Sequence, residues 1–302
     1  MKLLATFVFV ACSAVASSAF AQWGQPFDRR GLQHFDPTAI STEWRACTNE
    51  DYRFSAQDVI AGCTGAFEKA TSSDERASAL WWRALAYERA GDLQSSTVDF
   101  NAALAEFDTW ISDEPSLLEA RFQRASLLIS MREYDQALEA FEEVDRRRAR
   151  QPNVRASIGR IAFLRGDYEV AIAEYDLADR LARRSRTAGI VAHNRCEARA
   201  AAGIELDLAR TICDRAVRDS QYHPAVLVVR GFLRFRQDDM AGAMEDFERA
   251  LQREPNHAGA LYGRATVAAR NGQDEIAAAD LARSLEINPR MAEYYSAAGM
   301  RP

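Results

Sequence analysis

Two consecutive stretches of the sequence repeat one pattern in the same register, and this internal repeat restricts the fold more than any other feature. Residues 224–255 and 258–289 each show apolar residues at three- and four-residue steps, a polar turn, a second periodic run and a final proline, so that Leu227 corresponds to Leu261. This pattern predicts an amphipathic helix, a turn and a second amphipathic helix. Because one helix pair cannot bury its own apolar face, such units stack into a continuous array. The sequence therefore predicts an all-α protein.

The residues at fixed places in these units resemble the tetratricopeptide repeat family. The first unit has Gly231, Ala243, Phe247, Ala250 and Pro255 where that family has its small, alanine, aromatic, alanine and proline positions. Small residues let two antiparallel helices approach closely, and the aromatic side chain fills the layer between successive helix pairs. The resemblance implies a right-handed superhelical solenoid.

The same order of residues recurs toward the N-terminus, with some departures. Ser96 stands where an alanine is expected, and several units lack the final proline. The turns at Gly91 and Arg132 are further apart than the repeat spacing requires, and residues 109–116 hold the extra length as a loop or a longer helix end.

The resemblance implies about seven antiparallel helix pairs, followed by a C-terminal capping helix over residues 291–302. Together they form one solenoid over residues 40–302. The predicted hairpins are about 40–72, 77–110, 118–151, 152–185, 189–223, 224–257 and 258–290.

The cysteines agree with this register. The chain beyond residue 21 has an even number of cysteines, which favours disulfides in an exported protein. When the sequence is aligned to the repeat, Cys196 and Cys213 take the facing small and aromatic positions of one hairpin, and Cys47 and Cys63 take the same positions in another. We therefore expect Cys47 to pair with Cys63 and Cys196 with Cys213. Four buried free thiols are the alternative, and a metal site is disfavoured because neither a C-x-x-C motif nor a nearby histidine pair occurs.

The N-terminus has the features of an export signal. Lys2 precedes an apolar run, and a small-x-small cleavage site ends at Ala21, so residues 1–21 are predicted to be a signal peptide. Residues 22–39 lack periodicity and are expected to form an extended or disordered arm. Lipid attachment at Cys12 is disfavoured because Phe9 fits the preceding motif poorly. No later window is apolar enough to predict a transmembrane segment.

Composition and motifs narrow the class of function. The net charge of −6 argues against nucleic acid as a general partner. The four histidines are scattered along the sequence, and none of the common catalytic or phosphate-binding motifs occurs. We therefore expect a protein that is not an enzyme and needs no cofactor or metal.

The resemblance implies a concave groove lined by the first helix of each pair, which in this family usually binds peptides or protein segments. Large apolar residues and arginines outside the packing positions are candidate anchors, since aromatic residues and arginine dominate binding hot spots. The predicted groove residues are Trp81, Leu85, Phe122, Phe163, His193, Val228, Phe232, Phe235, Arg236, Tyr262 and Arg270.

These features predict an exported, non-catalytic scaffold that binds segments of envelope or secretion proteins. The resemblance and the arginine-rich composition favour the periplasm of a Gram-negative bacterium. One alternative is a structural protein that associates with itself. Another is binding of polysaccharide or anionic lipid through the arginine clusters at residues 146–150 and 183–186, although cations near helix ends are commonly explained by the helix dipole.

Overall fold

The protein is a solenoid of helix pairs. The computed structural model describes residues 41–48, 54–182 and 188–289, together with Met291, Ala292, Tyr295 and Arg301. Every regular element among the described residues is a helix, so the all-α prediction is confirmed. The predicted signal peptide and arm, residues 1–39, lie outside the described residues, as does most of the predicted capping helix.

Fourteen helices form seven successive pairs within the described part of the chain, in agreement with the predicted number. The pairs are α2 (Thr42–Thr48) with α3 (Ala56–Lys69), α4 (Ser73–Ala90) with α5 (Leu93–Asp113), α6 (Leu118–Ser130) with α7 (Tyr134–Arg147), α8 (Pro152–Arg165) with α9 (Tyr168–Leu181), α10 (Ala188–Ala202) with α11 (Leu206–Asp219), α12 (Pro224–Arg236) with α13 (Met240–Arg253), and α14 (Ala258–Arg270) with α15 (Asp274–Ile287).

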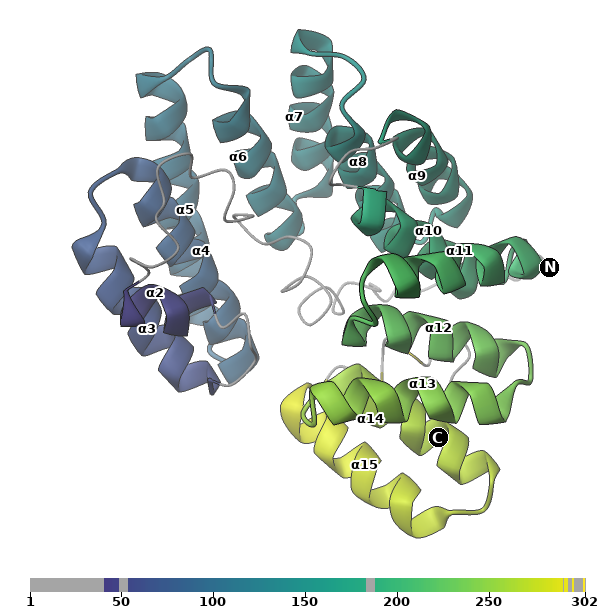
Figure 1. Cartoon of the computed structure of the whole chain (residues 1–302). Coiled ribbons are helices and arrows are strands. Elements are labelled where there is room, and N and C mark those ends of the chain that lie inside the picture. The colour runs from purple at the N-terminus through teal and green to yellow at the C-terminus, as the bar shows by residue number, and fades with distance from the viewer. Residues whose placement is uncertain are drawn as a thin grey trace, which may run out of the picture.

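The pairs follow one another in an arc, and the even-numbered helices line its inner side (Figure 1). Helix α10 contacts α8 and α12, and α12 also contacts α14. The main contacts of the odd-numbered helices are to even-numbered ones, as expected for an outer layer. The extra residues near the second pair lengthen α5, which runs for 21 residues before it ends at Asp113.

Close approach of the paired helices depends on the small residues that the repeat pattern predicts. A Cβ atom on Gly231 would lie 2.7 Å from the ring of Phe247, and one on Gly159 would lie 2.9 Å from the ring of Tyr175. The Phe247 ring also contacts Gly263 on α14, so it fills the layer between two successive pairs. These contacts explain why a glycine stands opposite an aromatic residue.

Two pairs without that aromatic residue carry a disulfide in its place. Cys47 on α2 is bonded to Cys63 on α3, with the Cα atoms 4.4 Å apart. Cys196 on α10 is bonded to Cys213 on α11, with the Cα atoms 5.1 Å apart. All four cysteines are completely buried. Each disulfide therefore joins the two helices of one hairpin.

In many hairpins, an arginine at the same repeat position of the first helix forms an ion pair with an acidic residue on a neighbouring helix. In three hairpins the arginine forms two hydrogen bonds to an aspartate on the second helix of the same pair, always at the same separation along the chain. These pairs are Arg83 with Asp99, Arg230 with Asp246, and Arg264 with Asp280. Two further arginines at this place bond to the preceding hairpin, namely Arg124 to Asp108, and Arg195 to Asp176 and Asp179.

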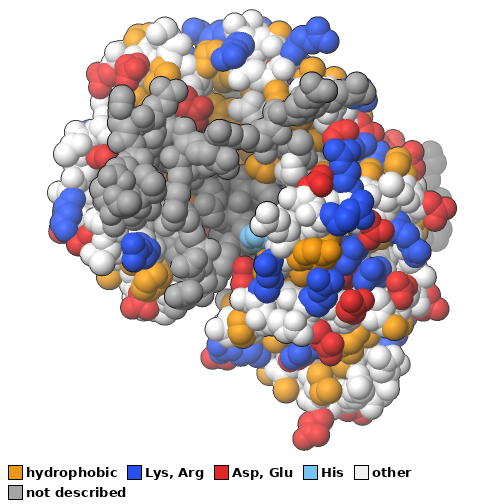
Figure 2. Space-filling view, viewed as in Figure 1, with side chains coloured by type: hydrophobic (Ala, Val, Ile, Leu, Met, Phe, Trp, Pro, Cys, Tyr) orange, Lys and Arg blue, Asp and Glu red, His pale blue; other side chains and the backbone are white. Residues whose placement is uncertain are grey.

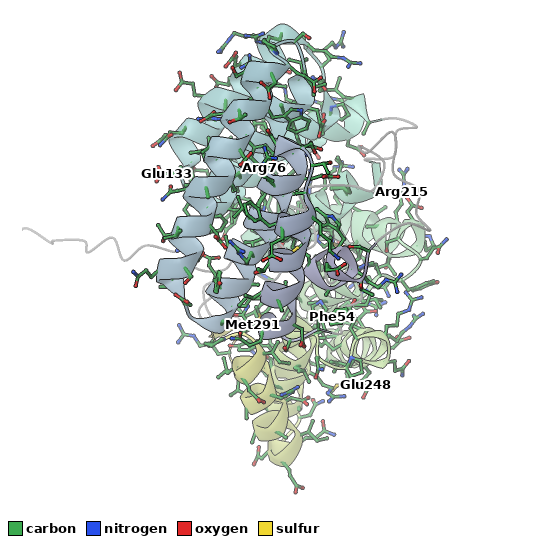
Figure 3. All side chains as sticks on the ribbon, turned by 90° about the vertical axis from the view of Figure 1, so that its left-hand side faces the viewer. Phe54, Arg76, Glu133, Arg215, Glu248 and Met291 are labelled. Carbon is green, nitrogen blue, oxygen red and sulfur yellow. A yellow bond between two sulfur atoms is a disulfide. The ribbon has the colours of Figure 1, made fainter. Side chains whose placement is uncertain are left out.

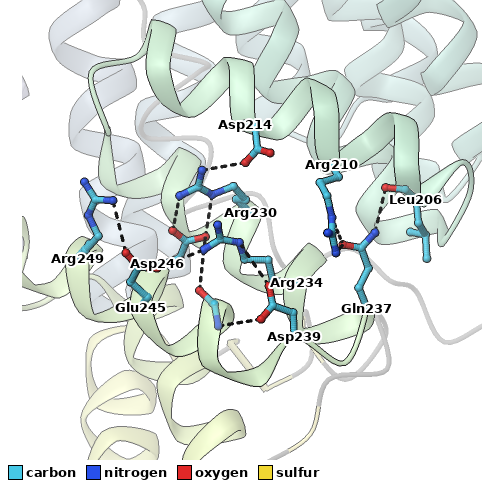
Figure 4. A network of polar contacts seen from close by, with 11 residues as sticks. Leu206, Arg210, Asp214, Arg230, Arg234, Gln237, Asp239, Glu245, Asp246 and Arg249 are labelled. Atoms are coloured by element: carbon cyan, nitrogen blue, oxygen red, sulfur yellow. Dashed lines mark hydrogen bonds and ion pairs between the residues drawn. The ribbon is translucent and has the colours of Figure 1, made fainter.

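The pair on α12 and α13 lies within the largest of these networks (Figure 4). Arg230 bonds to Asp246 at 2.6 Å and to Asp214 on α11 at 2.9 Å. Arg234, one turn further along α12, also reaches Asp246, at 3.0 Å. Because the contacts of Arg230 come from α11 and α13, this side chain joins two consecutive hairpins.

Candidate functional site: the concave surface

The predicted groove residues lie on the inner helices, but they differ widely in exposure. Arg236 and Arg270 are exposed to a larger extent than the rest, and Phe122 is partly buried. The remaining predicted residues are buried, namely Trp81, Leu85, Phe163, His193, Val228, Phe232, Phe235 and Tyr262. The two arginines therefore present the most accessible side chains of the predicted set.

Near the N-terminal end, the aromatic side chains pack between helices. The Trp81 ring lies edge-on to Phe107 on α5, with the ring centroids 6.2 Å apart. Its indole N–H donates a hydrogen bond to the Ser130 hydroxyl on α6 at 3.0 Å. Phe122 packs edge-on against Phe141 on α7, within its own hairpin. Trp81 thus joins two hairpins, and its chief role in the structure is packing.

A polar cluster occupies the middle of the concave surface, on α8 and α10. The Arg160 guanidinium forms an ion pair with Glu197 at 3.0 Å and lies 5.1 Å from the centre of the Phe163 ring. His193 lies one turn before Glu197. Tyr175 on α9 is close enough to Arg160 and Glu197 for both charges to act on the pKa of its hydroxyl. The structure therefore brings together two predicted residues, Phe163 and His193, around an ion pair.

Burial controls the protonation state of this cluster. His193 is 2% exposed, and its burial lowers its pKa to about 4, while the neighbouring Glu197 opposes this shift and Arg160 and His223 add to it. Burial also raises the pKa of the Tyr175 hydroxyl above its usual value. Both side chains are consequently neutral near pH 7.

The lowered pKa of His193 predicts a loss of stability in acid. A histidine in an unfolded chain has a pKa near 6.5. Below that pH the unfolded state binds a proton that the folded state takes up only near pH 4, so stability is full above pH 6.5 and falls as the pH drops toward 4. We expect His193 to contribute up to about 3 kcal/mol to this loss, at about 1.4 kcal/mol per pKa unit.

Urea unfolding of the wild type and of His193→Gln at pH 7.5 and 4.5 measures this contribution. The variant should lose less stability between the two values, although His257, whose pKa burial also lowers to about 4, leaves some pH dependence in both proteins. An identical loss in the two proteins would contradict the prediction.

At the C-terminal end, predicted residues of α12 and α14 meet across the hairpin boundary. The Arg270 guanidinium lies 4.8 Å from the centre of the Phe235 ring, a cation–π contact. Arg236 donates a hydrogen bond to the Ala201 carbonyl on α10 at 2.8 Å. Arg270 therefore lies beside an aromatic residue of the preceding hairpin, and Arg236 links the end of α12 to α10.

The arginine cluster at the end of α7 is partly neutralised by its own helix. Arg146 and Arg147 form ion pairs with Glu142 and Glu143, one turn earlier. The second cluster, residues 183–186, lies outside the described residues. On the face that Figure 2 shows, basic and acidic side chains of the described residues are interspersed.

Two other features are absent from the described segments. No group of three or more histidine, cysteine, aspartate or glutamate side chains there could hold a metal ion. In the same segments, no helix combines the length and the apolar character needed to span a bilayer.

Tyr295 is the concave-surface residue that sequence reasoning did not identify. It follows Met291, which packs beside the last hairpin (Figure 3). The Tyr295 ring stacks on Phe232 and Tyr262, two of the predicted groove residues. The repeat pattern continues beyond Pro289 and predicts a capping helix there. This pattern does not predict where the Tyr295 side chain lies.

Comparison with known proteins gives the same fold. The family model of the tetratricopeptide repeat matches residues 122–185 and 229–292. A tetratricopeptide repeat protein from Parabacteroides merdae is 16% identical, with 86% of this chain and 100% of that chain covered and a TM-score of 0.53. No curated protein sequence matches at a significant level.

Two further solved structures share the arrangement of helix pairs. PilW, a type IV pilus biogenesis factor, is 18% identical, with 73% of this chain and 97% of that chain covered and a TM-score of 0.55. The APC/C hetero-tetramer Cut9–Hcn1 contains a similar chain at 15% identity, with 89% of this chain and 51% of that chain covered and a TM-score of 0.60. The family model thus identifies tetratricopeptide repeats at residues 122–185 and 229–292, and the solved structures share the solenoid of helix pairs that these repeats form.

Proposed function

We propose that this protein is an exported, non-catalytic scaffold that binds segments of envelope or secretion proteins on its concave surface. The observation that supports it most lies on the continuous inner face of α8, α10, α12 and α14, where the accessible side chain of Arg270 lies against the Phe235 ring. Aromatic residues and arginine are the types that contribute most to protein–protein binding. The repeat fold is generally one of interaction scaffolds, and this agrees with the proposal.

Export is part of the proposal and rests on the sequence. The charged start, apolar run and cleavage site of residues 1–21 favour secretion, with the periplasm of a Gram-negative bacterium as the destination. The buried pairs Cys47–Cys63 and Cys196–Cys213 are compatible with an oxidising compartment. PilW, which shares the fold, is itself a pilus biogenesis factor, so an envelope partner is a reasonable first candidate.

The accessible arginine at the end of α14 provides the test. Arg270→Glu removes the cation–π contact with Phe235 and places a negative charge on the concave surface. We expect this change to lower the yield of partner proteins captured by crosslinking in cells about tenfold, the scale of losing one hot-spot arginine. Mass spectrometry of the captured proteins gives both the yield and the identity of the partner.

Arg218→Glu is the matched control because it makes the same charge change at an exposed position on the outer helix α11. It should leave the yield unchanged. Equal losses in both variants would contradict a concave binding site. Capture of the protein alone would instead support the self-associating alternative.

A further inference from the structure

The side chain of Tyr295 lies on the concave surface between two predicted groove residues. Its ring stacks on Phe232 of α12, with centroids 4.0 Å apart and an angle of 30° between the ring planes. It also stacks on Tyr262 of α14, with centroids 5.0 Å apart and an angle of 23°. Tyr295 is 7% exposed, so three aromatic rings from three helical segments form one nearly buried stack.

The space that receives this ring depends on a glycine. A Cβ atom on Gly259, near the start of α14, would lie 2.6 Å from the Tyr295 hydroxyl oxygen. Any other residue at position 259 would therefore force the tyrosine hydroxyl to shift. Val228 on α12 lies beside the same point, 3.4 Å from the position of that Cβ atom. The stack thus has a defined end as well as two flat sides.

Tyr295 makes contacts beyond the last hairpin. A helix that caps a solenoid needs to contact only the final repeat. Tyr295 instead contacts Phe232 in the preceding hairpin. Burial raises the pKa of the Tyr295 hydroxyl, and the nearby Glu197 carboxylate on α10 raises it further. Tyr295 therefore lies on the surface that the proposed function assigns to a partner.

We propose that Phe232, Tyr262 and Gly259 form a slot for one aromatic side chain of a bound protein segment, and that Tyr295 fills this slot as an internal competitor. The proposal rests on the proposed function, since a partner segment is the occupant that displaces Tyr295. The slot selects tyrosine or phenylalanine because two aromatic faces enclose a flat ring, and aromatic pairs prefer offset stacking. Tyr295 then regulates binding by lowering the fraction of molecules in which the slot is open.

The full-length chain and a synthetic peptide of residues 291–302, MAEYYSAAGMRP, test the slot directly. The peptide is titrated into the wild type, Tyr295→Phe and Tyr295→Ala, and binding is followed by nuclear magnetic resonance, which detects even millimolar affinity. We expect Tyr295→Ala to bind the peptide at least tenfold more tightly than the wild type, because its slot is open. Tyr295→Phe keeps the ring and should behave like the wild type.

A second peptide, with alanine in place of the residue that corresponds to Tyr295, controls for contacts elsewhere. It should bind all three proteins equally weakly. Equal affinity of the original peptide for the wild type and Tyr295→Ala would overturn the proposal. Absence of any binding to a folded Tyr295→Ala protein would overturn it as well.

If Tyr295→Ala does not fold, a double-mutant cycle of Gly259→Ala and Tyr295→Phe, measured by thermal unfolding, tests the proposal instead. The methyl group of Gly259→Ala collides with the tyrosine hydroxyl, which Tyr295→Phe lacks. Gly259→Ala should therefore lower the melting temperature more in the wild-type background than in the Tyr295→Phe background. Equal decreases in the two backgrounds would show that Tyr295 is not in the slot in solution.

The two proposals can fail separately. Loss of partner capture in Arg270→Glu together with no peptide binding would retain the concave site and reject the slot. Peptide binding that requires the aromatic residue, with no partner captured in cells, would support the slot and leave the scaffold function without support.

Discussion

Asp246→Ala is expected to destabilise the protein by about 3–5 kcal/mol, the range for removing one partner from a buried ion pair. The Asp246 carboxylate is 0% exposed, and burial raises its pKa against the opposing effect of Arg230 and Arg234. The substitution leaves the Arg230 guanidinium buried with only Asp214 as an acidic partner. Urea unfolding followed by circular dichroism at pH 7.5 measures the loss.

Asp108→Ala is the matched control, because Asp108 pairs with the arginine at the same repeated place in another hairpin. Its side chain is 54% exposed, so water screens the pair with Arg124 and the expected cost is below about 1 kcal/mol. Replacing both members of the buried pair, in Arg230→Met with Asp246→Leu, should cost less than Asp246→Ala alone, since no buried charge remains unpaired. A loss below about 1 kcal/mol in Asp246→Ala would show that the network in Figure 4 contributes little.

The solenoid architecture extends this local effect to the proposed slot. In a repeat array each unit is stabilised mainly by its own pairing and its immediate neighbours. Arg230 and Phe232 lie on the same helix, α12, so loosening the contacts of Arg230 with α11 and α13 weakens the helix that carries one side of the slot. Stability and binding are therefore coupled most strongly in the α12 hairpin.

The helix pairs could be predicted from the sequence because the signals for them are local. The register follows from small and aromatic residues at fixed spacing, such as Gly231 and Phe247, and their contact in the structure explains that spacing. The arginine–aspartate pairs were also visible in principle, since Arg230 and Arg264 take the same place in consecutive units and each is followed by an aspartate at the same separation. Both patterns join residues within one hairpin.

The details of the concave surface could not be predicted because they depend on contacts between hairpins. The repeat register places Trp81 on an inner helix, but its burial and its hydrogen bond to Ser130 in the next hairpin are seen only in the structure. The stack of Tyr295 on Phe232 depends on how the α12 and α14 hairpins are placed relative to each other. This placement is not encoded in the spacing of a single repeat.

The disulfides stabilise the two hairpins in which a cysteine pair takes the facing small and aromatic positions of the repeat. In the chain-entropy model, each closes a loop whose ends are 16 or 17 residues apart and contributes about 3 kcal/mol, chiefly by restricting the unfolded chain. Because the bonds lie in separate hairpins, α2–α3 and α10–α11, their effects should add. The second bond also fixes the helix that carries His193 and Glu197.

Removing both bonds, by replacing all four cysteines with alanine, should therefore cost about 6 kcal/mol, and each single pair about half of that. Urea unfolding of the four proteins measures these values, and thiol titration of the unfolded wild type should detect only Cys12, where that residue is retained. In the Cys196→Ala and Cys213→Ala double variant we also expect weaker partner capture, because α10 is no longer bonded to α11. Equal partner capture by this variant and by the variant of the α2–α3 pair would show that α10 needs no covalent support. Detection of four more free thiols would contradict both bonds.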